Sequence, residues 1–426
     1  MKGAAMKKIY IRTHAYNASE TLRRAVDSVL HQTHTDYIYY LCDNGSTDGG
    51  ATRRIIEAYA KLDRRIVPFY NEVNHVWDGS AEYIDLPLHV DDDDYFCELD
   101  ADDEYLPTFF EEMLAFMQEY DLDIACCGND YLDAAQENRL VSQRLLHATL
   151  ILEGQQFAEL FPYYHCFMRT CWGKLYKGGS LRNYITRHED CPNYPVAYGG
   201  DTFNTMRVFQ NARRVGILPR SLHKYYMSPK STSYTMHPQR IQCDQILHEA
   251  AMDYLNAFGP VSQRNRDFLY GVYMNALRDT ANLLLNAQIP DSEKLRYFIE
   301  MVSCRYTHQL MAWENFGVYH SENPQSVQDS RKELFKRIAG WLLSLSEVSN
   351  EQVEDYCNIG ELSSAAAEDS EGWIAFQKRR VKIYAMQGQI EKAKRKLDEL
   401  KELVPHDEDV PYLSQLIPAT EGTVTG

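Results

Sequence analysis

The sequence predicts an α/β domain, built on a mostly parallel sheet with helices on both faces, followed by an all-α C-terminal domain. Two observations predict this fold class. Strand and helix patterns alternate over residues 7–135, which is typical of a parallel sheet covered by helices. After about residue 240 the chain becomes rich in Leu, Ala, Glu and Lys, and few strand patterns remain.

Five strands are expected in the alternating region, each a short run of β-branched, aromatic or other apolar residues. They are Lys7–Arg12, Tyr37–Cys42, Arg65–Tyr70, Tyr95–Leu99 and Asp123–Cys127. Cysteines 126 and 127 are expected to act as small apolar residues of the last of these strands. The order of the strands indicates an open sheet whose ligands bind beyond the carboxyl ends of the strands.

Three helices are expected between the strands, because apolar residues recur there every three or four positions. Their inner faces are Leu22, Val26, Val29 and Leu30; Ile55, Tyr59 and Leu62; and Phe110, Met113, Leu114 and Met117. Asn17 and Glu20 resemble a capping box for the first helix. One of the residues 46–48 can cap the second, and Pro107 suits the first turn of the third.

The expected domains are residues 1–240 for the α/β part, 241–415 for the helical part and 416–426 for a disordered tail. A single tetratricopeptide-like helix pair is indicated near the end of the helical part, although three or more repeats usually form a stable unit. Its spacing is carried by Tyr384, Gly388, Ile390, Ala393, Leu397, Leu400 and Pro405.

Composition excludes several classes of partner. The net charge of −17 argues against nucleic acid or an anionic membrane as the main partner, and the basic run Lys392–Lys396 is expected to be a solvated helix face. No stretch approaches the roughly 20 apolar residues that span a bilayer. Ten cysteines without a Cys-x-x-Cys pair indicate neither a zinc site nor a disulfide framework. A cytoplasmic protein is therefore expected, either free or peripheral at the inner face of the membrane.

Three polar clusters follow the first, second and fourth predicted strands: Thr13–Asn17, Asp43–Asp48 and Asp100–Asp103. They should meet at one edge of the sheet. Neighbouring carboxylates raise each other's pKa, and Mg²⁺ or Mn²⁺ holding substrate phosphates would neutralise them. The run Asp91–Asp94 precedes a strand, so it is expected to be a solvated loop at the other edge.

Five segments, in this order and spacing, resemble the family 2 glycosyltransferases over roughly residues 7–235. They are Ile11–Leu22, Asp43–Asp48, Phe96–Leu106, Trp172–Tyr176 and Tyr198–Phe203, followed by His223–Tyr226 and Ser231–Ser233. The resemblance implies a GT-A, Rossmann-like fold. It also implies an inverting glycosyltransferase that moves a sugar from a nucleotide-sugar donor, expected to be a UDP-sugar, to a hydroxyl of a saccharide or glycoconjugate acceptor. Surface polysaccharide or glycoconjugate synthesis is the expected setting.

The same resemblance implies roles for individual residues. Asp201 would be the general base, and Asp100 and Asp102 would form a DxD motif that binds Mn²⁺ or Mg²⁺, with Asp102 the more direct ligand. The nucleotide sugar would be bound by Thr13, His14, Ala15, Tyr16, Asp43, Asn44, Asp100, Ala101 and Lys174. Arg169 is a second candidate for compensating phosphate charge, and His223 and His237 are both candidates for a third metal ligand. Gly200 stands where the family commonly has Glu.

Structural alternatives remain open for several of these residues. Asp43 could cap a turn, Asp201 could be the N-cap of a helix, and His14 could be a polar group of a turn. Trp172 fits either the core or a sugar platform. The cluster Tyr163–His165 could stack on an acceptor sugar or pack under the helical domain.

Two other functions compete with glycosyl transfer. A nucleotidyltransferase would need a Gly-rich, Arg-containing loop after the first strand, and Thr13–Asn17 is not one. Dinucleotide and P-loop fingerprints are also absent from the sequence. A catalytically inactive scaffold would use the helical domain as its interaction module, but the joint presence of Asp43, Asp100, Asp102 and Asp201 argues against it. The helical domain is a candidate for acceptor binding, for a protein partner or for oligomerisation.

Overall fold

The computed structural model describes residues 7–74, 89–183, 198–228 and 235–417, in two compact units, residues 1–265 and 266–426. The disordered tail expected at 416–426 lies almost entirely outside the described residues. The expected boundary at residue 240 falls inside the first unit, at the start of α7 (Arg240–Asn256). This helix belongs to the first unit because it packs against α6 (Gly200–Asn211).

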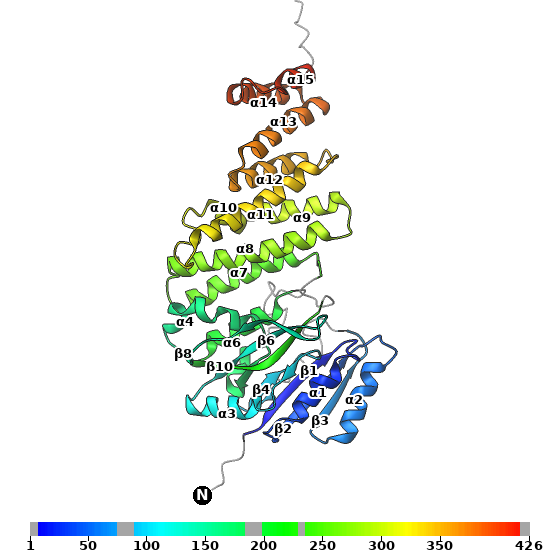
Figure 1. The fold of residues 1–426 in the computed structure, drawn as a ribbon, viewed down its shortest axis with the longest axis vertical. Helices are drawn as coiled ribbons and strands as arrows, with labels where there is room; N and C mark the ends of the chain where they lie inside the picture. Colours follow the sequence, from blue (N-terminus) through cyan, green and yellow to red (C-terminus); the bar gives the residue numbers. More distant parts are fainter. Residues whose placement is uncertain (1–6, 75–88, 184–197, 229–234, 418–426) are drawn as a thin grey trace, which may run out of the picture. The chain divides into compact units, whose positions relative to one another are not determined.

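The first unit is built on a ten-stranded mixed sheet (Figure 1). Its strands are β1 (Ile9–Ala15), β2 (Tyr37–Asn44), β3 (Ile66–Asn71), β4 (Tyr95–Glu98), β5 (Glu104–Tyr105), β6 (Ile124–Asp133), β7 (Arg139–Arg144), β8 (Leu150–Glu153), β9 (Lys174–Lys177) and β10 (Arg214–Met227). The order is β3-β2-β1-β4-β9-β6-β10-β5, with β7 beside β6 and β8 beside β10. Parallel pairing joins β3, β2, β1 and β4, and also joins β6 to β10, so the carboxyl ends of β1, β2 and β4 share one edge.

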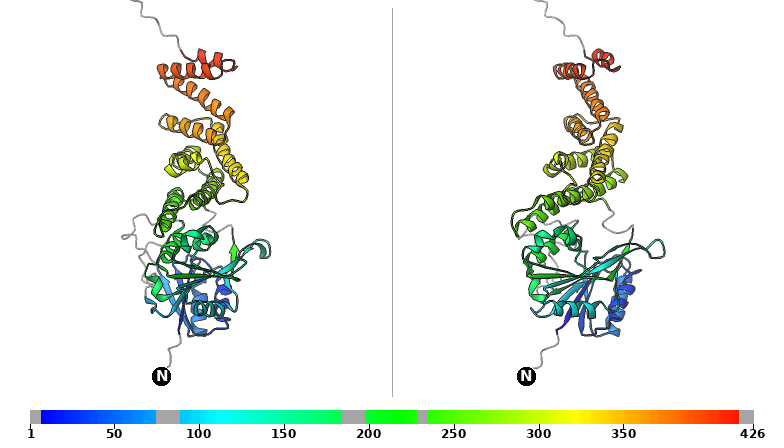
Figure 2. Two further views of the ribbon diagram at one scale, coloured as in Figure 1. Left: turned by 90° about the vertical axis from the view of Figure 1, so that its left-hand side faces the viewer. Right: turned by 60° about the vertical axis from the view of Figure 1, so that its left-hand side comes forward.

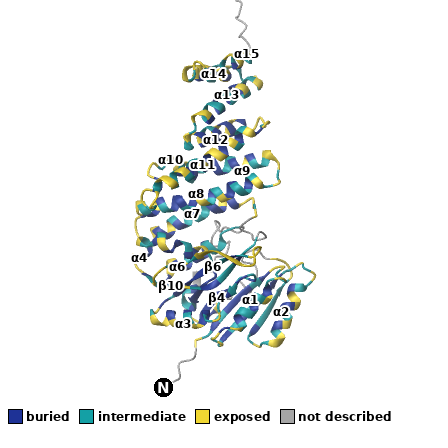
Figure 3. Cartoon of the chain, in the orientation of Figure 1, coloured by how far each residue is buried: buried dark blue, intermediate teal, exposed yellow. Residues whose placement is uncertain are grey.

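Helices lie on both sides of this sheet (Figure 2). The helices α1 (Leu22–Leu30), α2 (Ala51–Leu62) and α3 (Phe109–Glu119) contribute to one hydrophobic core with β1, β2 and β4. Short helices follow β8, namely α4 (Gln156–Glu159), α5 (Phe161–Tyr164) and η2 (His165–Arg169), and η3 (Gly178–Asn183) follows β9. The predicted α/β class is confirmed, and all five expected strands and three expected helices are present. The buried centre of the sheet is visible in Figure 3.

Three local predictions were wrong. Leu62 is 81% exposed, because it is the last residue of α2 and has turned past the inner face of that helix. The capping box of Asn17 and Glu20 does not form, since α1 begins at Leu22 and its N-cap residue is Thr21. The side chain of Asn17 instead accepts a hydrogen bond from the next loop. The N-cap of the second helix is Gly50 and not one of the predicted residues 46–48, although Asp48 Oδ2 accepts hydrogen bonds from Thr52 N (3.0 Å) and Thr52 Oγ1 (2.6 Å) in the first turn.

The second unit is helical throughout its described residues, which confirms the expected all-α C-terminal domain. Its helices are α8 (Gln263–Asn286, which begins just before the boundary), α9 (Asp291–Ser303), α10 (Arg305–Ala312), α11 (Pro324–Ser344), α12 (Val353–Ala366), α13 (Ser370–Met386), α14 (Ile390–Leu403) and α15 (Val410–Gln415). The residues with tetratricopeptide-like spacing lie in α13, in α14 and in the turns that follow these two helices; the two helices pack around Val381, Leu397 and Leu400. Among the helices described, none is long and apolar enough to cross a membrane.

Two glycines of the second unit form a natural comparison. A Cβ added to Gly360, on α12, would lie 2.3–2.5 Å from the ring of Phe376 on α13, whereas one added to Gly340, on α11, would meet nothing within 4 Å. We expect Gly360→Ala to destabilise this helix packing by about 1–3 kcal/mol through overpacking. Gly340→Ala should stabilise α11 by roughly 0.5–1 kcal/mol, the usual gain in a helix.

Hydrogen exchange of the α11, α12 and α13 amides measures both effects. Equal and small effects of the two substitutions would show that α12 and α13 do not pack as closely as the structure has them.

Candidate active site

The loop after β1 is held in place by Thr13. The Thr13 hydroxyl donates a hydrogen bond to Leu99 O (2.6 Å) and accepts one from Tyr39 OH (3.0 Å), so it ties β1 to β2 and to the segment after β4. Ala15 is fully buried, and burial lowers the pKa of His14 well below its usual value. Tyr16 is 45% exposed. Of the four residues Thr13–Tyr16, therefore, Tyr16 is the one with an exposed side chain that a ligand could contact. The hydrogen bonds of Thr13 hold the loop in place.

The loop after β2 begins with Asp43, which lies beside Ala15 in the parallel register. Asp43 is buried, and its Oδ1 accepts a hydrogen bond from Ser46 N (3.0 Å), so it does form a turn. The amide of Asn44 accepts a hydrogen bond from Asn71 (2.8 Å), the last residue of β3, and donates one to Asn74 (2.9 Å), so both ends of that side chain are bonded to β3 and the segment after it. Because this turn uses Oδ1, the other carboxylate oxygen of Asp43, Oδ2, is the one that could accept a hydrogen bond from a ligand.

Asn17 joins these two loops. It adopts a left-handed backbone conformation (φ +51°), its Oδ1 accepts a hydrogen bond from Thr47 N (2.7 Å), and its own N–H donates to Ser46 Oγ (2.9 Å). Asn is among the residues that tolerate this conformation. The expected ligand loops after β1 and β2 are thus fixed to each other.

In the acidic cluster after β4, Asp103 is fully buried, and Asp100 and Asp102 are partly buried. Burial and the neighbouring carboxylates of Asp103, Asp102 and Asp201 raise the pKa of Asp100 well above its usual value. Burial also raises the pKa of Asp102, with Arg24 acting against it. Ala101 between them is buried. Asp201, about a hundred positions further along the chain, is near enough for its charge to raise the pKa of Asp100.

Asp103 and His223 form a second buried pair behind this cluster. Both are fully buried, and Asp103 Oδ2 lies 3.2 Å from His223 Nε2. Asp103 Oδ1 accepts a hydrogen bond from Tyr226 N (3.1 Å). Burial lowers the pKa of His223 to about 3, so its ring is neutral. Of the two histidines considered as metal ligands, His223 lies in the acidic cluster, whereas His237 is exposed and accepts a hydrogen bond from Gln239 N.

Asp201 is the second residue of α6 and is not its N-cap. The N-cap is Gly199, in the left-handed conformation (φ +81°) that glycine adopts without strain. Burial and the negative charge of Glu98 raise the pKa of Asp201 to about 6. A hydrogen bond from the Cys171 thiol and the positive charge of Lys174 act against this rise. Gly200, which replaces the family's usual Glu, is the first residue of the helix.

Lys174 is fully buried on β9. Its Nζ donates hydrogen bonds to Thr170 O (2.5 Å), Thr170 Oγ1 (3.3 Å) and Trp172 O (3.2 Å). This ammonium group is therefore bound by the loop before β9, and it affects Asp201 through charge. Arg169 is exposed, and its carbonyl accepts a hydrogen bond from Thr202 Oγ1 (3.0 Å).

The aromatic candidates are divided between core and surface. Trp172 is 4% exposed and stacks between His223 (4.4 Å) and Tyr225 (5.3 Å), so it belongs to the core. Tyr164 and His165 are buried as well, and Tyr164 OH lies 2.8 Å from Tyr254 OH. Tyr163 is 55% exposed and is the residue of this cluster available for stacking on a ligand.

Sequence reasoning missed three charged residues at this edge. Arg12 and Glu98 are opposite each other in the β1–β4 register and form a buried ion pair through Arg12 Nε (2.6 Å) and Nη2. Arg24, on α1, donates to the carbonyl of Asp102 and lies over the ring of Tyr226 (3.5 Å). A signal for the first pair was present, because a charged residue in a buried strand needs a partner.

The carboxylates Asp100 and Asp102 fit a hard divalent cation. Such ions take oxygen ligands, and Mg²⁺ is usually held by one or two carboxylates together with substrate phosphates. In the part of the chain that the structure describes, no three His, Cys, Asp or Glu side chains are grouped so that they could hold a metal ion alone. The remaining ligands would then come from the substrate and from water.

Part of the chain is similar to known glycosyltransferases. Residues 11–184 match the model of the glycosyl transferase family 2. The glycosyltransferase YibD of Escherichia coli is 24% identical over 228 residues, 53% of this chain and 63% of that protein. The chondroitin synthase of E. coli is 30% identical over 173 residues, 40% of this chain and 24% of that protein.

A crystal structure of S. aureus TarS (residues 1–349) in complex with UDP is 15% identical, covers 88% of this chain and 91% of that one, and has a TM-score of 0.42. The chain thus spans less than two thirds of the length of YibD, and the sequence matches centre on the α/β unit. Residues 11–184 of this chain are thus similar to glycosyltransferase family 2.

Proposed function

We propose that the chain is an inverting glycosyltransferase that transfers a sugar from a UDP-sugar to an acceptor hydroxyl, in the synthesis of a surface polysaccharide or glycoconjugate. The observation that carries this proposal is the gathering of Asp100, Asp102 and Asp201 at the edge where β1, β2 and β4 end. Burial raises the pKa of all three carboxyl groups, and the charges of Asp102 and Asp201 raise that of Asp100 further, so a positively charged ligand would stabilise the site. The match of residues 11–184 to family 2 supports the same reaction.

Asp201 is the general base of the proposed reaction. Its carboxylate takes the proton of the acceptor hydroxyl while that oxygen attacks the anomeric carbon, and the bond from this carbon to the diphosphate breaks on the opposite side. A pKa of about 6 leaves Asp201 ionised at neutral pH and still basic enough to accept a proton. The position of Asp201 in the first turn of α6 fixes the carboxylate near Asp100.

Asp100 and Asp102 are the residues that would hold Mn²⁺ or Mg²⁺. When bound, such an ion supplies Lewis-acid stabilisation of the departing diphosphate. Arg24 holds the backbone of Asp102 in place. Tyr16 and Asp43 are placed to contact the nucleoside at the neighbouring loops, while Thr13, Ala15 and Asn44 shape those loops.

Asp102→Ala tests the proposed metal site. Because it removes the more direct ligand, we expect the affinity for UDP in the presence of Mn²⁺ to fall by about 100-fold, the upper end of losses seen at metal sites. Affinity without metal should change little. Titration calorimetry with UDP, with and without Mn²⁺, measures both values.

Asp93→Ala is the matched control, because Asp93 is an exposed member of the acidic run before β4 and makes a long ion pair with Lys177 (3.9 Å). Its substitution should leave nucleotide affinity unchanged. The same loss in both variants would move the metal site away from Asp102. If the wild-type chain did not bind UDP at all, the inactive scaffold would be the better description.

The donor is best sought by a hydrolysis screen. Slow transfer of the sugar to water needs no known acceptor, so the release of UDP or GDP from common nucleotide sugars with Mn²⁺ present reports activity directly. We expect turnover with a UDP-sugar. Turnover with GDP-sugars alone would keep the reaction and change the nucleotide.

A further inference from the structure

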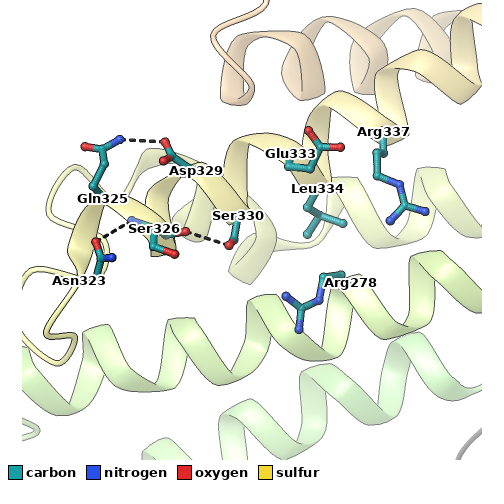
Figure 4. Close-up of a pocket in the computed structure, with 9 residues that line it drawn as sticks. All are labelled: Arg278, Asn323, Gln325, Ser326, Asp329, Ser330, Glu333, Leu334 and Arg337. Carbon is teal, nitrogen blue, oxygen red and sulfur yellow. Dashed lines mark hydrogen bonds between the residues drawn. The ribbon is translucent and has the colours of Figure 1, made fainter.

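The second unit contains a polar cavity between α8 and α11, with a volume of about 570 Å³ (Figure 4). It is lined by Arg278 of α8 and by residues from the N-terminal two-thirds of α11, including Ser326, Ser330 and Arg337. A second cavity of about 220 Å³ shares Arg278, Ser326 and Ser330 with the first. Volumes of several hundred cubic ångströms are typical of small-ligand sites.

Two arginines in this cavity have no partner among the described residues. Neither Arg278, which is half-buried, nor Arg337 makes a hydrogen bond or ion pair there. Other basic residues of α11 are satisfied: Arg331 donates to the carbonyls of Leu310 (3.0 Å) and Trp313 (2.9 Å), and Lys332 pairs with Glu368 (2.7 Å). A half-buried guanidinium gains most from an anionic partner.

In Figure 4 the side chain of Arg337 extends from α11 toward α8, into the gap where Arg278 lies. Asp329 and Glu333 line the same cavity, but among the described residues neither carboxylate forms an ion pair with Arg278 or Arg337. Asp329 instead accepts a hydrogen bond from Gln325 (2.8 Å).

Two of the other lining residues, Ser330 and Asn323, suit hydroxyls. Ser330 Oγ donates to Ser326 O (2.8 Å), which leaves its lone pairs to accept a hydrogen bond. Asn323, the N-cap of α11, accepts from Ser326 N (3.2 Å) and keeps its amide N–H groups to donate. The positive end of the helix dipole also lies here.

The smaller cavity adds a fixed histidine. His320 Nδ1 lies 2.9 Å from Asp267 Oδ2, and the buried Asp267 also accepts hydrogen bonds from Trp313 Nε1 (3.0 Å) and from the backbone of Gly317 (2.9 Å). Such a bond fixes the orientation of the ring and holds the proton on Nδ1. Gly271 leaves room for this ring, since an added Cβ would lie 3.1 Å from His320 Nε2.

From these contacts we infer that the α8–α11 cavities form a binding site for a polyhydroxylated anion, such as a phosphorylated or carboxylated sugar unit. Arg278 and Arg337 bind the anionic group, and Ser330, two helical turns before Arg337 on α11, binds a ring hydroxyl. Arginine is suited to both phosphate and carboxylate because of its planar set of donors. This site lies wholly in the second unit, and the inference does not depend on the proposed transfer reaction.

Three sugars with the same ring test the inference in the full chain: glucose 6-phosphate, glucuronate and glucose. We expect both anionic sugars to bind, as followed by ligand-observed NMR, and glucose to bind at least about tenfold more weakly. Arg278→Gln and Arg337→Gln should each reduce the affinity for the anionic sugars by about tenfold or more, the loss expected for a hydrogen bond to a charged group. The better of the two anionic sugars identifies the preferred charged group.

Lys336→Gln is the matched control, because it removes one positive charge from an exposed position next to Arg337. It should leave affinity unchanged. The inference would be overturned if glucose bound as tightly as the anionic sugars, or if neither anionic sugar bound. It would also be overturned if both arginine variants kept the wild-type affinity. Arg337 is exposed, so its variant should stay folded even if Arg278→Gln does not. Binding of UDP in these variants reports separately on the proposed transferase site.

Discussion

Replacement of Asp201 by Asn is expected to lower the rate of sugar transfer by about 10³-fold, within the range that general bases contribute. The amide cannot accept the proton of the attacking hydroxyl, although it fills nearly the same space. Affinity for UDP should stay close to that of the wild type, because Asp201 acts on the acceptor. The release of UDP from the donor identified by the screen measures the rate, and calorimetry measures the affinity.

The pH dependence of the transfer rate is a second test of the role of Asp201. Burial and the charge of Glu98 raise the pKa of Asp201 to about 6. The hydrogen bond from Cys171 and the positive charges of Lys174 and Arg12 lower it, but by less. The protonated acid cannot act as a base, so wild-type activity should be constant above this pKa and fall tenfold for each pH unit below it. The residual activity of Asp201→Asn should lack this acidic limb.

Asp253→Asn makes the same chemical change at an exposed position of α7 and should leave the rate and the pH profile unchanged. Wild-type turnover by Asp201→Asn would remove the base assignment. A loss of UDP affinity as large as the loss of rate would instead indicate a role in donor binding.

The sequence predicts the sheet well because its strands and helices have clear periods. The runs around Ile11, Leu41 and Phe96 have no helical spacing and end in polar clusters, so both their class and the edge at which ligands bind follow from local patterns. Leu62 shows the limit of such patterns, because the exposure of a terminal helical residue depends on where the helix stops.

The candidate site is only partly readable from local patterns. That the clusters after β1, β2 and β4 lie at one edge follows from parallel pairing. The proximity of Asp201 to Asp100 cannot be inferred from strand pairing, because α6 is distant from β4 in the sequence. The family resemblance is what predicts it. The hydrogen bond from Thr47 to Asn17 and the pairing of Asp103 with His223 depend on contacts between distant segments, which a single sequence does not display.

The ion pair of Arg12 and Glu98 is the clearest case of a contact set by strand register. The two residues are opposite each other on β1 and β4, and their side chains are 2% and 7% exposed. Arg12 also lies over the ring of Phe96 (5.3 Å), and Glu98 raises the pKa of Asp201. Removing either charge leaves the other buried beneath the proposed catalytic carboxylate.

Arg12→Met is therefore expected to destabilise the first unit by about 3–5 kcal/mol, the usual effect of breaking a buried ion pair on one side. The double variant Arg12→Met/Glu98→Met should recover most of this loss, because the cost comes from the unpaired charge. Arg53→Met is the control: its pair with Glu57 is about half exposed, and the loss should stay within about 0.2–1 kcal/mol. Hydrogen exchange of the β1 and β4 amides measures all three. A single variant as stable as the wild type, or a double variant less stable than the single one, would show that burial of this pair does not set the stability of the sheet.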